Sequence, residues 1–160
     1  MDKHISLEQV GELSSTIHQQ NKRIVLLGGC FDILHSGHII FLEEAKKQAD
    51  ILIVLLESDE TIAASKGPKR PINSQSDRAK ILSALEVVDY VILLKPDMDN
   101  KAYDDLVIEI KPAIIATTSG DINRHHKERQ AELVRAKVID VTTPITDKST
   151  TRLIHMLDEL

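Results

Sequence analysis

Five short apolar runs alternate along this chain with longer segments of helical periodicity, and this alternation limits its possible folds strongly. Each run is almost entirely apolar, as expected of a strand that is buried on both faces. Strands that alternate with helices form a parallel sheet with right-handed crossovers. The pattern predicts strands at residues 24–27, 51–56, 90–94, 113–116 and 138–141.

The segments between these runs predict helices at residues 7–20, 39–49, 76–85, 103–110, 127–136 and 150–160. The fold class expected is α/β, a single Rossmann-like doubly wound domain with a five-stranded parallel sheet and an N-terminal helix. Residues 1–22 are expected to form an N-terminal helical extension, in which Ser6 and Gln9 fit a capping box. Residues 23–160 are then the main domain.

Composition and charge limit the class of protein. The chain has 160 residues, of which 42% are hydrophobic and 28% charged, which suits one soluble domain with its own core. Its net charge of −5 argues against a broad surface for nucleic acid. No membrane-length apolar run and no signal peptide is predicted, so the cytoplasm is the expected compartment. The single cysteine, Cys30, excludes an internal disulfide and a multi-cysteine zinc site.

The segment 28–38, Gly-Gly-Cys-Phe-Asp-Ile-Leu-His-Ser-Gly-His, lies where the first predicted strand passes into a helix. His35 and His38 are three residues apart at the helix start, and therefore share one face. The unpaired backbone N–H groups of a helix start attract anions, and Gly37 allows a ligand to approach the backbone closely. This arrangement suits a nucleotide phosphate whose charge grows during reaction. The alternative for two nearby histidines is an ordinary capped helix start.

Cationic side chains follow the second predicted strand, at the same edge of the sheet as the histidines. The loop 66–73 carries Lys66, Lys69 and Arg70, and Arg78 opens the next helix. These cations are suited to clamping the β- and γ-phosphates, and we favour Lys66 and Arg78 for this role. A solvated turn is the alternative.

Two further segments offer polar groups at helix starts. Ser149, Thr150 and Thr151 begin the last predicted helix, where hydroxyl and backbone donors would bind phosphate. Helix capping alone is the alternative. Asp121 follows the fourth predicted strand, where its carboxylate would either accept hydrogen bonds from a sugar hydroxyl or cap a helix.

The motif Gly-x-Phe-Asp followed by His-x-Gly-His resembles the signature of the cytidylyltransferase-like nucleotidyltransferases. In these enzymes a small molecule attacks the α-phosphate of a nucleoside triphosphate and releases pyrophosphate. Within this superfamily the chain is most similar to the heptose 1-phosphate adenylyltransferases, which make ADP-heptose for lipopolysaccharide or surface glycans. The likeness extends to residues 66–73, 77–79, 88–91 and 149–151. It implies that residues 23–160 are a nucleotidyltransferase domain.

The resemblance also implies roles for individual residues. His35, His38 and Lys66 are the expected catalytic residues, since they would hold the α-phosphate and neutralise triphosphate charge. The expected nucleotide-binding residues are Gly29, Cys30, Phe31, Asp32, Gly37, Arg78, Ser149, Thr150 and Thr151. Acceptor contacts are expected from Asp32, Thr118 and Asp121. ATP or CTP would be a substrate, and Mg²⁺ would bridge its phosphates, so we expect no protein metal cage.

The chain departs from the family pattern at two places. Leu27-Gly28 replaces the usual Thr-Asn, and Thr118-Ser119-Gly120-Asp121 replaces the usual Lys-Gly-Gly-Asp. Intact triphosphate chemistry is therefore expected, while the acceptor and the base stay open.

Other functions remain as alternatives at this point. They are a glycerol-3-phosphate-type cytidylyltransferase, an FAD-synthetase-like adenylyltransferase, and a nucleotide-binding paralogue without turnover. A dinucleotide oxidoreductase is disfavoured, since Gly-x-Gly-x-x-Gly does not follow the first strand. As partners we expect small-molecule substrates and a second copy of the chain in a homodimer, with no nucleic acid or membrane.

Overall fold

The computed structural model describes residues 2–144 and 149–159. These residues form an all-parallel sheet of six strands in the order β1-β4-β3-β2-β5-β6. The strands are β1 (His4–Ile5), β2 (Ile24–Gly29), β3 (Ile51–Leu56), β4 (Tyr90–Leu93), β5 (Ile114–Thr118) and β6 (Lys137–Thr142). The α/β Rossmann-like class predicted from the apolar runs is confirmed.

The predicted count of five strands is corrected by β1. This strand has only two residues, one of them polar, so it leaves no apolar run in the sequence. It pairs with β4, where His4 lies opposite Val91 and Ile5 opposite Ile92. The N-terminal extension therefore adds an edge strand to the sheet as well as a helix. The predicted boundary between residues 22 and 23 stays a prediction.

Helices connect successive strands, and all of the predicted helices are present with shifted ends. The helices are α1 (Val10–Gln19), α2 (Ser36–Lys46), α3 (Asp59–Lys66), α4 (Gln75–Ser83), α5 (Asn100–Ile110), α6 (Arg124–Val134) and α7 (Thr150–Asp158). A 3-10 turn at Leu7–Gln9 precedes α1, and the Gln9 side chain accepts from the Ser6 N–H at 2.9 Å, which confirms the predicted capping box. Helix α3 was not expected, because Ile62 is its only buried residue and gives no apolar stripe. Leu160, the predicted end of the last helix, lies outside the described residues.

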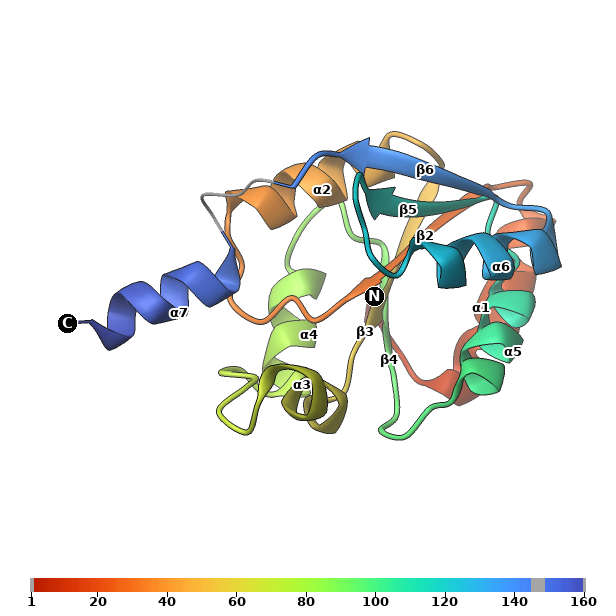
Figure 1. Ribbon diagram of the computed structural model, residues 1–160. Helices are drawn as coiled ribbons and strands as arrows, with labels where there is room; N and C mark the ends of the chain where they lie inside the picture. Colours follow the sequence, from red (N-terminus) through yellow and green to blue (C-terminus); the bar gives the residue numbers. More distant parts are fainter. Residues whose placement is uncertain (1, 145–148, 160) are drawn as a thin grey trace.

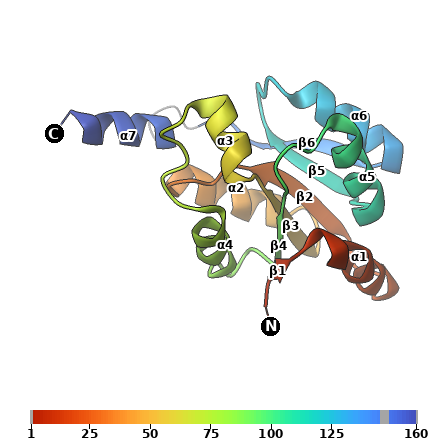
Figure 2. The ribbon, with the colours of Figure 1, turned by 90° about the horizontal axis from the view of Figure 1, so that it is seen from below.

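Helices cover both faces of the sheet, as a doubly wound fold requires (Figure 1). On one face, α2 and α4 bury Leu42, Ala45, Ala79 and Leu82 against the strands. On the other face, α1, α5 and α6 pack on the sheet, with Leu106 among their buried residues. Helix α7 differs from the others, since it extends away from the body of the molecule in both views (Figures 1 and 2).

The order of the strands reverses between β2 and β5. From β2 the chain proceeds through β3 and β4 toward one edge, and then returns to add β5 and β6 on the other side. Because α2 and α6 follow these two strands on opposite faces, a crevice opens beyond their carboxyl ends, where ligands of such sheets bind. Among the described residues, no helix is long and apolar enough to cross a membrane.

Candidate active site

The two histidines of the sequence motif cap the start of α2. The N-cap residue is His35, and its Nδ1 accepts a hydrogen bond from the Gly37 N–H at 3.1 Å. The Nδ1 of His38 accepts from the His35 N–H at 3.3 Å, and the two ring centroids are 3.9 Å apart. In a neutral imidazole whose Nδ1 accepts, the proton is on Nε2. Capping and phosphate binding are thus compatible, because they use different ring nitrogens.

Burial chiefly, and then the electrostatic effects of His35 and Lys66, lower the pKa of His38 from 6.5 to about 4. The His38 ring is therefore neutral at physiological pH. Phe31 packs beside it, with ring centroids 5.3 Å apart. Phe31 has a φ of 46°, and a Cβ at Gly29 would lie 2.8 Å from its ring, so a glycine is needed there. Gly29 and Phe31 thus help to set the position of His38.

The carboxylate of Asp32 is bound entirely to the loop that follows α3. It accepts hydrogen bonds from the backbone N–H groups of Ile72 and Asn73 and from Arg70 Nε, at 2.8–3.0 Å. Burial by itself raises the pKa of Asp32, but these three donors together outweigh burial and lower it. Asp32 therefore holds the cationic loop against the histidine motif. Its expected contacts with nucleotide and acceptor stay predictions.

Arg78 belongs to α4, contacts the motif at Cys30 and is fully buried. Its guanidinium donates to the carbonyl oxygens of Asn73, Cys30 and Glu57 and to Asp59 Oδ1, at 2.6–3.1 Å. These contacts fix the ends of β2 and β3 relative to each other. The phosphate contact of Arg78 stays a prediction, and these hydrogen bonds favour a positioning role.

Two other segments that were predicted to bind phosphate lie near the histidine motif. Lys66 is the exposed last residue of α3, and its charge contributes to the lowered pKa of His38. Thr150, at the start of α7, donates from Oγ1 to the Ile33 carbonyl in the motif loop at 2.8 Å. Ser149 caps this helix by accepting from the Arg152 N–H at 3.1 Å. The fold thus brings the start of α7, with exposed Thr151, to the loop that precedes α2.

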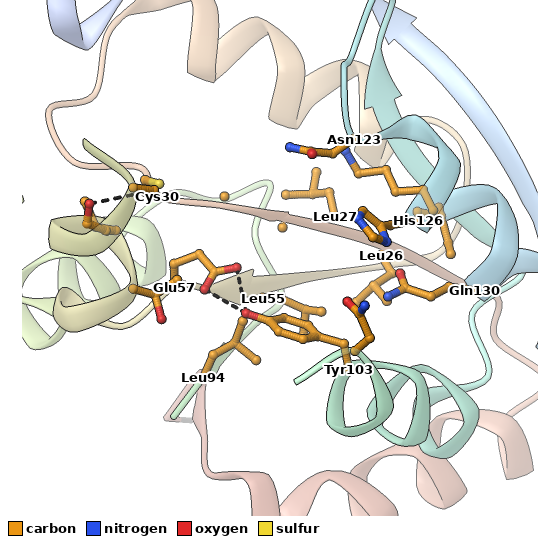
Figure 3. A pocket seen from close by; sticks show the side chains of 18 of the residues that line it. Leu26, Leu27, Cys30, Leu55, Glu57, Leu94, Tyr103, Asn123, His126 and Gln130 are labelled. Atoms are coloured by element: carbon orange, nitrogen blue, oxygen red, sulfur yellow. Dashed lines mark hydrogen bonds between the residues drawn. The ribbon is translucent and has the colours of Figure 1, made fainter. Parts of the chain in front are cut away.

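A cavity of about 590 Å³ opens beside these groups, at the carboxyl ends of the strands (Figure 3). Its floor is the apolar surface of β2, β3 and β5, and its walls come from α3, α5 and α6. Gly29, Cys30 and Lys66 border it, which joins it to the region of the histidine motif. Sequence reasoning missed several of its polar side chains, namely Glu57, Tyr103, Asn123, His126, Lys127 and Gln130.

Glu57 and Tyr103 form a pair in this cavity. The Tyr103 hydroxyl lies 3.1 Å and 3.0 Å from the two carboxylate oxygens of Glu57. Burial raises the pKa of Glu57, although the Tyr103 hydrogen bond and the charge of Arg78 oppose this. Burial and the charge of Glu57 also raise the pKa of Tyr103 above its usual range. The position of Glu57, directly after an apolar strand, was the one available sequence signal.

The predicted acceptor residues Thr118 and Asp121 do not border the cavity. Asp121 accepts hydrogen bonds from Thr117 Oγ1 at 2.7 Å and the Asn123 N–H at 2.9 Å, and it pairs with Lys127. Burial raises the pKa of Asp121, but these donors outweigh it and lower the pKa to about 2. Lys127 thus places a cation beside the loop 118–121. In this loop Thr118 stands where the heptose 1-phosphate adenylyltransferases usually have a lysine.

The donor set of the site is cationic and imidazole-rich. Within residues 2–144 and 149–159, no group of three or more His, Cys, Asp or Glu side chains is arranged to hold a metal ion.

Known proteins with similar sequences match nearly the whole chain. The bifunctional protein HldE of Aliarcobacter butzleri is 38% identical over 162 residues, which is 99% of this chain and 32% of the relative. The HldE of Campylobacter fetus is also 38% identical, over 97% of this chain and 31% of the relative. The chain therefore spans about a third of the length of these curated relatives.

Solved structures agree with this result. The lipopolysaccharide core biosynthesis protein of Thermoplasma volcanium is 34% identical, with a TM-score of 0.60 over 77% of this chain and 97% of that chain. A pantoate-beta-alanine ligase of Francisella tularensis, at 15% identity and a TM-score of 0.64, covers 100% of this chain and 79% of its own, and shares the fold. The cytidylyltransferase-like family model matches residues 26–156. The chain thus belongs to the cytidylyltransferase-like family and is a nucleotidyltransferase.

Proposed function

We propose that the protein transfers the adenylyl group of ATP to a sugar 1-phosphate, with heptose 1-phosphate as the first acceptor to test. The main support is the pair of mutually capping histidines at the start of α2, with Lys66 and the start of α7 beside them. The choice of ATP and heptose rests on the sequence resemblance to the heptose 1-phosphate adenylyltransferases. The similarity to HldE proteins and to a lipopolysaccharide core biosynthesis protein supports the same choice.

In this reaction a phosphate oxygen of the acceptor attacks the α-phosphorus of ATP. A new P–O bond forms, the bond from the α-phosphorus to the bridging oxygen of the β-phosphate breaks, and pyrophosphate leaves with that electron pair. The acceptor is itself the nucleophile, so the protein needs no covalent intermediate. Catalysis then depends on positioning and on stabilising charge.

Each group of the site has a role in this scheme. His38 donates its Nε2–H to an α-phosphate oxygen, and His35 supports it from the N-cap. Lys66 offsets charge on the departing pyrophosphate, and Ser149, Thr150 and Thr151 offer donors at the start of α7. Asp32 and Arg78 act as positioning residues. A magnesium ion bound with the triphosphate would add charge neutralisation.

Pyrophosphate release with purified protein tests this proposal. We expect release with ATP and heptose 1-phosphate, slower release with CTP, and little with glycerol 3-phosphate. Calorimetry with each nucleotide checks the base preference independently. Nucleotide binding without pyrophosphate release, across a panel of sugar phosphates, would contradict the proposal and favour a paralogue without turnover.

Two lesser expectations belong to the same proposal. We propose the cytoplasm as the compartment of the protein, as expected from the sequence. We also propose that the protein forms a homodimer. Light scattering on the purified protein would test this.

A further inference from the structure

Glu57 places a carboxylate in the cavity that the phosphate chemistry does not use. It directly follows β3, and its main chain is held on two sides. The Glu57 N–H donates to the Gly29 carbonyl at 3.2 Å, and its own carbonyl accepts from Arg78 Nη2 at 2.8 Å. The backbone of Glu57 is thus fixed to the strand that leads into the histidine motif. Its side chain extends into the cavity toward Tyr103 (Figure 3).

The carboxylate retains capacity to accept further hydrogen bonds. Two carboxylate oxygens offer about four lone-pair sites, whereas the Tyr103 hydroxyl supplies a single proton to them. Within the part of the chain that the structure describes, the hydrogen bonds to this carboxylate come from Tyr103 alone. A partly buried carboxylate is stable only when donors satisfy it, so a bound ligand with hydroxyl donors is favoured here.

The opposite wall of the cavity carries polar groups as well. His126 and Asn123 come from α6 and its N-cap, across the cavity from Glu57 (Figure 3). The Nδ1 atom of His126 is buried and has no hydrogen-bond partner among the described residues. Gln130, one helical turn further along α6, adds an amide. An apolar floor with polar groups on facing walls suits a compact molecule that carries several hydroxyls.

Charge decides which part of the reactants enters the cavity. A triphosphate would meet the negative charge of Glu57 there, whereas Lys66 at the border and the helix start of α2 attract it. The hydroxyl groups of a neutral sugar ring are instead good donors to a carboxylate. Because Gly29, Cys30 and Lys66 border the cavity, a sugar held inside can present its phosphate to the histidine motif.

We propose, on the basis of the function proposed above, that Glu57 binds the hydroxyl groups of the sugar acceptor and is a specificity-determining residue, with Tyr103 positioning its carboxylate. His126, on the facing wall of the cavity, forms a hydrogen bond with the sugar as donor or acceptor. The acceptor class that this site takes is a polyhydroxylated sugar phosphate, with at least one hydroxyl hydrogen-bonded to Glu57.

The first test compares wild type with Glu57→Gln and Tyr103→Phe in steady-state kinetics. We expect the KM for the sugar 1-phosphate to rise about ten- to a hundredfold in Glu57→Gln, as for loss of a charge-assisted hydrogen bond, with the KM for ATP unchanged. Tyr103→Phe should raise the acceptor KM less, and kcat should change little in either variant. Glu60→Gln removes an exposed glutamate of the neighbouring α3 and should match wild type.

A second measurement identifies the partner of Glu57. Sugar 1-phosphates that each lack one hydroxyl are compared between wild type and Glu57→Gln. The compound that lacks the hydroxyl bound by Glu57 should bind wild type more weakly than the complete sugar 1-phosphate does. The same compound should bind wild type and Glu57→Gln equally, because the hydrogen bond to Glu57 is absent from both complexes. A general structural defect would weaken all of the compounds alike. Tyr103→Phe provides the same comparison if Glu57→Gln does not fold.

Several outcomes would overturn the inference. An unchanged acceptor KM in Glu57→Gln would do so, and so would a raised KM for ATP alone, which would assign the cavity to the base. Failure of the proposed function looks different, since wild type would then release no pyrophosphate with any acceptor. Calorimetry of sugar 1-phosphate binding still tests Glu57 in that case. Weaker binding by Glu57→Gln would uphold the inference, and equal binding would overturn it.

Discussion

Asp32 and Arg70 form a buried ion pair, with 2.9 Å between Oδ2 and Nε, that joins the histidine motif to the cationic loop after α3. The Asp32 side chain is 1% exposed and the Arg70 side chain 9%. Because the same carboxylate binds two backbone N–H groups of the loop, the loop cannot move independently of the motif. Asp32 is thus a structural link between the two segments that are proposed to bind phosphate.

Asp32→Asn should destabilise the protein by about 3–5 kcal/mol, since it leaves the buried Arg70 without its counter-ion and places an NH₂ group among donors. Urea unfolding at neutral pH measures this loss. Asp105→Asn, which removes an exposed carboxylate of α5, should leave the unfolding free energy nearly unchanged. Equal stability of Asp32→Asn and wild type would show that the pair does not hold the loop.

His38→Ala should lower kcat about a hundredfold or more while ATP affinity changes little, because the donor matters most when charge develops on the α-phosphate. Pyrophosphate release gives kcat, and calorimetry gives the affinity. His125→Ala removes an exposed histidine of α6 and serves as the control. Undiminished turnover in His38→Ala would remove the histidine from the mechanism.

Stability should also depend on pH through His38. Its pKa is lowered from 6.5 to about 4 in the folded protein, chiefly by burial. Between these values the unfolded chain binds a proton at this side chain and the folded chain does not, so stability falls as the pH drops through this range. In His38→Gln the loss between about pH 7 and about pH 5 should be smaller than in wild type. Parallel urea titrations at both pH values compare the two, and identical pH dependence would contradict the lowered pKa.

Arg78→Met distinguishes positioning from phosphate binding. It keeps the aliphatic stem but removes the donors to the carbonyls of Cys30, Glu57 and Asn73, so we expect a loss of about 3 kcal/mol or more. Lys80→Met, at an exposed position on the same helix, is the control. Full stability combined with weaker ATP binding would support the phosphate contact predicted from sequence instead.

The sequence predicted most of the sheet because β2 to β6 carry runs of apolar residues that are informative on their own. Strand β1 is too short for such a signal, and its pairing with β4 depends on residues about 87 positions away, as from His4 to Val91. Helix α3 lacks an apolar stripe, and its N-cap Ser58, which accepts from the Thr61 N–H at 3.1 Å, was its main local signal. Contacts with distant parts of the chain, and not apolar periodicity in the sequence, stabilise both elements.

The site, like the fold, has some parts that could be predicted from the sequence and others that could not. The histidine motif was predictable because its residues lie at one strand–helix junction, where spacing alone places both rings on one face. Glu57 and Tyr103 are 46 residues apart and meet only when α5 packs beside β3. The charge of Arg78 was visible in the sequence, but its complete burial was not, since a cation in a first helical turn is usually solvated.

Lys127 offers a last test of how the altered loop after β5 affects the acceptor. It borders the cavity and pairs with Asp121, so Lys127→Met would leave the Asp121 charge uncompensated near a site proposed to take an anionic acceptor. We expect the acceptor KM to rise about tenfold, as for loss of one charge-assisted contact, with the KM for ATP unchanged. Lys101→Met, at an exposed position on α5, is the matched control. Adding Asp121→Asn to Lys127→Met should recover much of the loss if repulsion causes it. Should the acceptor KM of Lys127→Met equal that of wild type, this loop has no part in binding the acceptor, and Thr118→Lys would be expected to change nothing.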